Sequence, residues 1–318
     1  MHPRLPPRFL ILAIVLLVAA PVLAAPYDMV AVGNNVGGCF FLPFSITRIE
    51  WLNHWTEEPT NIHTVAAAPG GRVYAAVAGP RIEIVELKAD QSRTAFFSGA
   101  DGYKAASLAV DSALNIHVLA QTGATAAIIS ISSSGALTAI HPLGFEIDDR
   151  DDAFDLAADQ CTVVIGAGSA IRRFNVCTGT ALPDLASIYA TDLAFLPSGE
   201  VLVANDTGLH RYDSLSVLLG TIVLDDYPNT ITLRNEGTRV LVETGCESGR
   251  LHNVDLNTGA IADAGGTFVT QPRVILVPDG WTAAFGAPAS HAPVPTLSTW
   301  ITIAFATLLA LTALHRMS

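Results

Sequence analysis

The chain has 318 residues, of which 50% are hydrophobic and 14% are charged, and its mean hydropathy is +0.43. This composition excludes an intrinsically disordered protein and is more apolar than that of an ordinary soluble domain of this length. The formal net charge of −12 argues against nucleic-acid binding, because a surface of that sign repels phosphate backbones.

Residues 1–24 have the pattern of a secretory signal peptide. Arg4 and Arg8 form a positive segment, residues 9–20 are an uninterrupted apolar run, and residues 22–24 offer a cleavage position. The alternative is an uncleaved membrane anchor, although the run is shorter than the about 20 residues that span a bilayer. We therefore expect an exported protein.

Residues 25–287 repeat one pattern: an apolar strand, a tight polar turn and a second apolar strand. The units begin at Val65, Leu108, Leu156, Leu193, Ile231 and Val274. Many of the turns contain glycine, as in Pro-Ser-Gly at 197–199, because glycine adopts the positive φ that tight turns require. Successive units start about 37 to 48 residues apart, the length of one four-stranded propeller blade. The pattern predicts an all-β protein with a β-propeller fold.

The predicted number of blades depends on whether strands from the two ends of residues 25–287 combine in one blade. Five units look complete, whereas the unit at Val274 stops after two predicted strands, near Phe285. Residues 29–32 and 46–51 are predicted strands without a preceding partner. We expect six blades, the sixth combining strands from both ends and so removing an exposed sheet edge. Seven blades is the alternative, if residues 39–55 contain further strands.

Cys161 and Cys177 lie on either side of a predicted hairpin whose turn is at 166–170. In that register Val163 faces Asn175, and the two cysteines oppose each other directly. Opposed hairpin positions bring Cβ atoms into the range that a disulfide needs. We therefore predict a Cys161–Cys177 disulfide.

Cys39 and Cys246 are the remaining pair, and their pairing is a weaker prediction. An even number of cysteines is typical of exported proteins. No Cys-x-x-Cys motif occurs, so the sequence does not favour zinc or thioredoxin-type redox chemistry. Residues 155–161 and 173–179 together resemble a blade common in secreted bacterial propellers of the NHL and WD40 type.

The densest run of charge contains Asp148, Asp149, Asp151 and Asp152, whose oxygens could bind Ca²⁺. The run lacks the alternating acidic spacing and the central glycine of a dedicated calcium loop. We therefore favour a solvated loop between blades. A second acidic pair precedes Pro228, and it would join the first at the mouth of the channel if both loops lie on one rim.

The sequence contains no motif for metal or serine hydrolysis, neither His-Glu-x-x-His nor Gly-x-Ser-x-Gly. His117, His210 and His252 fall on strands, the last two at similar points of their blades, which indicates descent by repetition rather than a shared ligand site. Six-bladed propellers resembling lactonases and NHL-type lyases would place a metal or histidine site at the channel mouth.

The C-terminal residues form a tail of three parts. Residues 288–293 are a proline-rich linker, residues 300–314 are an apolar segment that begins with Trp300, and Arg316 follows as a cationic stop. Alone, this pattern indicates a membrane anchor whose tail stays on the cytoplasmic side.

Residues 294–318 also resemble the IPTL-CTERM sorting signal of Gram-negative bacteria. The motif comprises Val294, Pro295, Thr296, Leu297, Ser298 and Trp300. Val294 replaces the usual Ile, and Thr299 and Ile301 replace a usual acid and Gly. The resemblance implies recognition by an exosortase-type membrane protease and delivery to the cell surface.

These features predict an exported, surface-displayed β-propeller that binds an unknown extracellular ligand without catalysis and without a cofactor. The alternative is an extracellular metal-dependent enzyme similar to the lactonase or lyase propellers, with Ca²⁺ as a possible ion. The lack of a catalytic motif favours the binding module.

Overall fold

The computed structural model describes residues 27–34, 47–51, 54–58, 62–88, 92–123, 125–147, 153–233, 237–245, 249–268 and 273–278. All of them belong to the first of two units of the chain, Met1–Thr282, and the second unit is Ala283–Ser318. The predicted signal peptide, linker and sorting signal, with its membrane helix at 300–314, lie outside the described residues. Within the described ranges no helix has the length and apolar character to cross a membrane.

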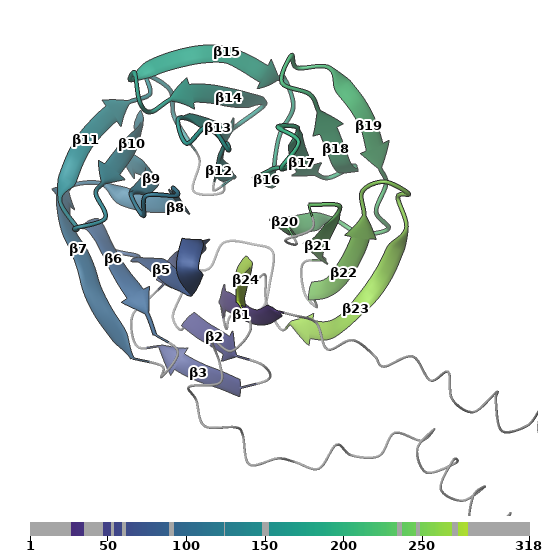
Figure 1. The fold of residues 1–318 in the computed structure, drawn as a ribbon, viewed down its shortest axis with the longest axis horizontal. Coiled ribbons are helices and arrows are strands. Elements are labelled where there is room, and N and C mark those ends of the chain that lie inside the picture. The colour runs from purple at the N-terminus through teal and green to yellow at the C-terminus, as the bar shows by residue number, and fades with distance from the viewer. Residues whose placement is uncertain are drawn as a thin grey trace, which may run out of the picture. The chain divides into compact units, whose positions relative to one another are not determined.

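Five blades each consist of four consecutive antiparallel strands (Figure 1). The first two blades contain β4 (Ile62–Ala68), β5 (Arg72–Val77), β6 (Arg81–Leu87) and β7 (Arg93–Asp101), then β8 (Lys104–Val110), β9 (Ile116–Thr122), β10 (Thr125–Ile131) and β11 (Leu137–Pro142). The next two contain β12 (Phe154–Leu156), β13 (Thr162–Ala167), β14 (Ala170–Asn175) and β15 (Thr180–Ala186), then β16 (Asp192–Phe195), β17 (Val201–Asn205), β18 (Gly208–Tyr212) and β19 (Leu218–Ile222). The fifth contains β20 (Pro228–Leu233), β21 (Arg239–Thr244), β22 (Gly249–Asp255) and β23 (Ile261–Phe268).

A further four-stranded sheet combines the two ends of the repeat region. Its strands are β24 (Arg273–Pro278), β1 (Tyr27–Asn34), β2 (Thr47–Trp51) and β3 (His54–Glu58), in the order β24-β1-β2-β3. β1 pairs with β24 from Tyr27 opposite Pro278 to Val32 opposite Arg273. The predicted pairing of strands from both ends is therefore confirmed. The C-terminal side contributes one described strand instead of two, and the N-terminal side contributes three.

The sheets are arranged around a ring whose inner strands contact one another in a closed cycle. β4 contacts β8, and the contacts continue through β12, β16, β20 and β24 back to β4. β8, β12, β16 and β20 lie nearest the centre, and β7, β11, β15, β19 and β23 lie on the outside (Figure 1). The described residues form six four-stranded sheets without a seventh. The predicted all-β propeller is confirmed.

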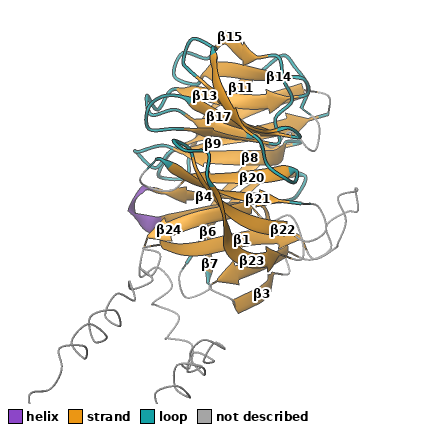
Figure 2. Ribbon diagram, turned by 90° about the vertical axis from the view of Figure 1, so that its right-hand side faces the viewer, coloured by secondary structure: helices purple, strands orange, loops and turns teal. Residues whose placement is uncertain are grey.

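The hydrophobic core lies between neighbouring blades. Successive residues of a strand point to opposite faces of its sheet, yet Val118 and Leu119 of β9 are both fully buried. Val118 packs in a cluster with the preceding blade, and Leu119 packs with the following one. Figure 2 shows that strands dominate the described chain, with one short 3-10 helix, η3 (Pro69–Gly71). Polar groups between blades are consequently desolvated.

The turns between strands confirm the glycine pattern. Gly199, in the turn between β16 and β17, has a φ of +85°, and its amide donates to the carbonyl oxygen of Leu196 at 2.8 Å. Gly179, in the turn between β14 and β15, has a φ of +69°. A side chain at either position would be strained in this left-handed region.

Candidate functional site

A polar cavity of about 250 Å³ lies between the β8–β11 blade and the β12–β15 blade. Its walls come from the turn after β8, from β9, β10 and β11, and from two turns of the following blade. The lining residues with polar side chains include Asp111, Asn115, His117, Ser130, Thr138, His141 and Gln160. This cavity brings together a carboxylate, an imidazole and a hydroxyl group.

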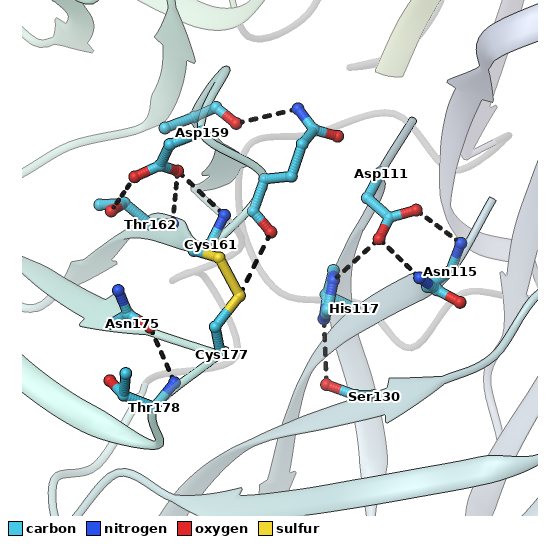
Figure 3. Close-up of a disulfide and its surroundings, with 12 residues drawn as sticks. Asp111, Asn115, His117, Ser130, Asp159, Cys161, Thr162, Asn175, Cys177 and Thr178 are labelled. Atoms are coloured by element: carbon cyan, nitrogen blue, oxygen red, sulfur yellow. Dashed lines mark hydrogen bonds and ion pairs between the residues drawn. A yellow bond between two sulfur atoms is a disulfide. The ribbon is translucent and has the colours of Figure 1, made fainter. Parts of the chain in front are cut away.

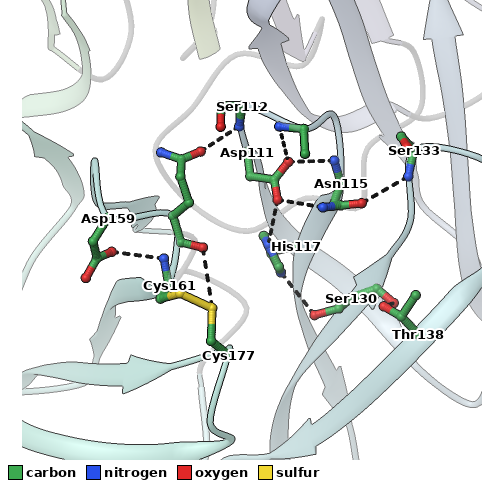
Figure 4. A network of polar contacts seen from close by, with 12 residues as sticks. Asp111, Ser112, Asn115, His117, Ser130, Ser133, Thr138, Asp159, Cys161 and Cys177 are labelled. Atoms are coloured by element: carbon green, nitrogen blue, oxygen red, sulfur yellow. Dashed lines mark hydrogen bonds and ion pairs between the residues drawn. A yellow bond between two sulfur atoms is a disulfide. The ribbon is translucent and has the colours of Figure 1, made fainter.

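Asp111 organises the turn between β8 and β9. Its Oδ1 accepts hydrogen bonds from the amides of Ala113 at 2.9 Å and Asn115 at 2.7 Å. Its Oδ2 accepts from Asn115 Nδ2 at 2.7 Å (Figure 4). Both carboxylate oxygens are therefore committed to the turn, which is the usual role of an aspartate that begins a tight turn.

His117 is a buried histidine on β9, and it is 7% exposed. Its Nδ1 lies 3.0 Å from Ser130 Oγ on β10, where the two residues are directly opposed, and its Nε2 lies 3.9 Å from Asp111 Oδ2. Burial lowers the pKa of His117; the charge of Asp111 opposes this shift, and His141 adds to it. The imidazole is consequently neutral near pH 7.

A neutral imidazole beside a hydroxyl group is the arrangement of a general base and a nucleophile. Here Ser130 is itself only 7% exposed. Asp213, between β18 and β19, accepts hydrogen bonds from the amides of Leu215 and Val217, the same positions relative to the aspartate as at Asp111. The carboxylate of Asp111 therefore stabilises its turn whether or not an imidazole lies nearby. We interpret Asp111, His117 and Ser130 as a structural network rather than a catalytic group.

The predicted Cys161–Cys177 disulfide is confirmed, with the Cα atoms 5.3 Å apart (Figure 3). It lies at one wall of the polar cavity. The preceding residue, Gln160, accepts a hydrogen bond through Oε1 from the amide of Ser112 in the neighbouring blade (Figure 4). The disulfide joins the turn before β13 to the turn after β14, and Gln160 links the first of these turns to the turn after β8.

The predicted hairpin register was wrong by one position. Val163 faces Phe174 rather than Asn175, and β13 and β14 meet at Ala167 opposite Ala170. Cys161 therefore does not oppose Cys177 directly, and its carbonyl instead accepts from the amide of Val176 at 2.8 Å. The disulfide forms because Cys177 lies in the turn after β14, where the chain bends back toward Cys161. Cys39 and Cys246 lie outside the described residues.

His210 and His252 occupy equivalent strands, β18 and β22, whereas His117 is on the second strand of its blade. His210 Nε2 lies 2.9 Å from Asn205 Oδ1, and His252 Nε2 lies 3.1 Å from Thr244 Oγ1. Each imidazole contacts a polar side chain at the end of the second strand of its blade. This similarity agrees with the interpretation that they descend from one repeat.

The acidic run is described only in part, since Asp148, Asp149, Asp151 and Asp152 lie outside the described residues. Asp159, beyond it, caps a turn: Oδ1 accepts from the amides of Cys161 and Thr162, and Oδ2 accepts from Thr162 Oγ1 at 2.7 Å. Over the described ranges, no three His, Cys, Asp or Glu side chains are grouped so as to hold a metal ion.

Two aspartates link blades near the centre of the ring, and sequence reasoning missed both roles. Asp155 Oδ2 accepts from the amide of Phe195 on β16 at 2.7 Å, and Asp192 Oδ2 accepts from the amide of Ile231 on β20 at 2.7 Å. Each Oδ1 accepts from the amide of the following residue. Aligning the repeat units would have exposed this feature. A polar residue precedes the apolar start of five units: Thr64, Ser107, Asp155, Asp192 and Thr230.

The outer strand β19 and the segments directly before and after it expose an apolar surface that the sequence did not distinguish from a buried strand. Leu215 is 81% exposed and Val223 is 71% exposed. Between them, Val217, Leu218 and Leu219 are each about half exposed. We call residues 215–223 the β19 edge. Apolar surface of this kind typically marks an interaction site.

The β19 edge differs from the other outer strands in composition. β7, β11, β15, β23 and β3 each contain a charged residue, a histidine or a proline, which are the usual means of protecting a sheet edge. β19 reads Leu-Leu-Gly-Thr-Ile and contains none of these. Its one hydrogen-bonded neighbour among the described strands is β18. Within the described part of the chain, the main chain on its outer side has no partner strand.

No protein-family model and no curated protein matches the chain. Among solved structures, it is similar to a protein of unknown function from Bacteroides caccae, with a TM-score of 0.58 and 13% sequence identity over 80% of this chain and 99% of the other. It is also similar to a chain of a nidogen/laminin complex, with a TM-score of 0.56 and 12% identity over 79% of this chain and 98% of the other. At these identities the likeness establishes the β-propeller fold and nothing about function.

Proposed function

We propose that this β-propeller is a non-catalytic binding module and that the β19 edge is its contact surface for a partner protein. The single observation that carries the proposal is the exposure of five apolar side chains on one outer strand, β19, and the segments directly before and after it. Those residues are Leu215, Val217, Leu218, Leu219 and Val223. An isolated exposed leucine is ordinary on a protein surface, whereas a contiguous group of them favours an interface.

The polar cavity supports this proposal indirectly. Its most reactive-looking group, Ser130 with His117, is buried, and the nearby carboxylate of Asp111 is committed to a turn. A metal-dependent lactonase or lyase remains an alternative proposal. It rests on the acidic residues at 148–152 and on a resemblance of fold, and no contact among the described residues favours it.

We also propose that the module is exported and displayed at the cell surface. This proposal is supported by sequence alone: the signal-peptide pattern of residues 1–24 and the resemblance of residues 294–318 to a sorting signal. A membrane sorting protease of exosortase type would be the partner of that tail. A surface-displayed module needs a face that is free to meet its partner, and an exposed edge such as β19 would provide one.

Leu219→Lys tests the proposed contact surface. Because Leu219 is about half exposed, the free energy of unfolding should change by no more than about 0.5 kcal/mol. A charge in the middle of the apolar surface should weaken binding of a partner by at least about tenfold. The measurement compares the proteins of the source organism that the immobilised wild-type chain and the variant retain, by quantitative mass spectrometry.

Ile261→Lys is the matched control, since it places the same charge at an exposed apolar position of another outer strand, β23. A partner retained by the wild type and by this control, but lost with Leu219→Lys, supports the proposal. If no retained protein distinguishes Leu219→Lys from the control, the β19 edge is not the contact surface.

A further inference from the structure

The outer side of β19 has no partner strand among the described residues. β19 pairs with β18 from Leu209 opposite Ile222 to Tyr212 opposite Leu218, and with no other described strand. In an antiparallel edge strand, alternate residues direct their N–H and C=O groups away from the sheet. Gly220, in the middle of the strand, is exposed, and a Cβ atom there would meet no other atom within 4 Å. Glycine inside a strand often marks a place where another backbone approaches closely.

The start of the β19 edge is held in place before any partner arrives. Asp213 Oδ1 accepts hydrogen bonds from the amides of Leu215 at 2.9 Å and Val217 at 2.8 Å. Arg173 of the neighbouring blade donates through Nη1 to the carbonyl oxygen of Ser214 at 3.0 Å. A preorganised strand loses less conformational entropy on binding than a mobile one.

Acidic residues flank the β19 edge at both ends. Asp213 precedes it, and Asp225 and Asp226 follow it, both exposed. No charged residue lies between Asp213 and Asp225. At the start of the surface the guanidinium of Arg173 lies beside Ser214 and offsets the charge of Asp213, so the negative end is the one at Asp225 and Asp226. A complementary partner has an apolar centre with a positive segment at the end that meets Asp225 and Asp226, because complementary charge across an interface steers association and sets register.

These observations identify the class of partner. We propose that the β19 edge binds an extended segment of another protein as an added antiparallel strand, and that this segment has alternating apolar residues preceded by lysine or arginine, which meet Asp225 and Asp226. The proposal rests on the proposed binding function and specifies its partner. Main-chain hydrogen bonds supply the affinity in this mode, while the flanking charges supply selectivity.

A second copy of the chain fits this edge poorly. Antiparallel pairing of two β19 strands would bring together two chains that each carry a net charge of −12, and like net charges repel.

The test uses the full chain and a synthetic peptide of alternating valine and threonine preceded by two lysines. Isothermal titration should show binding that weakens with added salt, because exposed charges are screened. Two control peptides carry glutamates in place of the lysines, or N-methyl groups on alternate valines. Both should bind at least about tenfold more weakly, a loss of about 1.4 kcal/mol or more.

Variants of the chain complete the test. Leu219→Lys should abolish peptide binding, and Asp225→Asn with Asp226→Asn should weaken it several-fold. Glu146→Gln, an exposed acid on another blade, should leave it unchanged. Equal binding of the N-methylated peptide would overturn strand addition, and equal binding of the glutamate peptide would overturn the basic residues of the proposed partner. A dimer in light scattering that Leu219→Lys dissociates would overturn the proposal in favour of a second copy.

The two proposals fail in different ways. If a natural partner depends on Leu219 but the peptides behave alike, the binding function stands and strand addition is wrong. If no partner depends on Leu219, the proposed function itself is wrong, whatever the peptides do.

Discussion

Glu243 is a fully buried carboxyl group on β21. Its neighbours along the strand, Val240 and Val242, pack in the core toward the β16–β19 blade, so by strand alternation Glu243 faces the opposite side. Burial raises the pKa of Glu243 from 4.5 to about 8, the amide of Asn229 opposes this shift, and the charge of Asp226 adds to it. The folded protein therefore holds this side chain in its neutral form through neutral pH.

The raised pKa makes folding stability depend on pH. Below the unfolded-state pKa of about 4.5 the side chain is neutral in both states, and the stability is fully present. As the pH rises from 4.5 to about 8, the unfolded chain releases its proton first, so the free energy of unfolding falls by an amount on the order of a few kcal/mol.

Glu243→Gln should remove this loss, because an amide has no proton to release in this range. Urea titrations should give similar stabilities for the wild type and the variant near the acidic end of the window, and a more stable variant at its alkaline end. Glu146→Gln, an exposed acid, serves as the control and should leave the pH dependence unchanged. A constant difference between the wild type and Glu243→Gln across the window would show that the buried carboxyl does not titrate as inferred.

At the scale of elements, neighbouring inner strands are joined by aspartates that each accept two hydrogen bonds from main-chain amides. Asp192 is 3% exposed and uses both of its oxygens: Oδ1 accepts from the amide of Leu193 at 2.9 Å and Oδ2 from that of Ile231 at 2.7 Å. Asp155 makes the equivalent pair of contacts one blade earlier. The inner edge of one blade is thus satisfied by the side chain of the blade before it, as buried amides require.

Asp192→Asn should destabilise the fold, since asparagine has one acceptor oxygen and leaves one of the two amides facing a donor. The loss of one buried hydrogen bond costs about 1 to 3 kcal/mol. Asp213→Asn is the matched control, because Asp213 accepts both of its amide hydrogen bonds through Oδ1 alone. Chemical denaturation of the two variants should separate them clearly. Equal losses would mean that the second acceptor of Asp192 contributes nothing.

At the scale of the whole molecule, the sheet formed by β24, β1, β2 and β3 closes the ring. β1 lies between β24 and β2, so both ends of the repeat region depend on it. Without β1, β24 would lose its hydrogen-bonded partner and the blades at the two ends would lose the sheet that joins them. An open sheet edge invites aggregation.

Deleting residues 1–34, which removes β1, should abolish cooperative unfolding and promote aggregation. Deleting residues 1–25 leaves β1 whole and should preserve the melting temperature. Circular dichroism during heating and light scattering at room temperature follow the two outcomes. If the longer deletion melts with the same midpoint as the shorter one, closure by β1 is not needed for stability.

Features that depend on residues close along the chain were predicted from the sequence more accurately than features that depend on residues far apart. The turn at Gly199 and the disulfide between Cys161 and Cys177 were both predictable, because each depends on residues close along the chain. The register of the hairpin that holds the cysteines was missed by one residue. A turn of five residues and one of two fit the same sequence, and only packing on the neighbouring blades selects between them.

The sequence alone determined the β-propeller architecture and the joining of its two ends, because strand and turn signals are local and repeat along the chain. It did not determine which apolar strand is buried. β17, Val-Leu-Val-Ala-Asn, is entirely buried, whereas β19, Leu-Leu-Gly-Thr-Ile, is largely exposed, and both read as apolar strands. Tertiary structure decides this difference, because burial depends on whether a strand lies within its blade or at the outer edge.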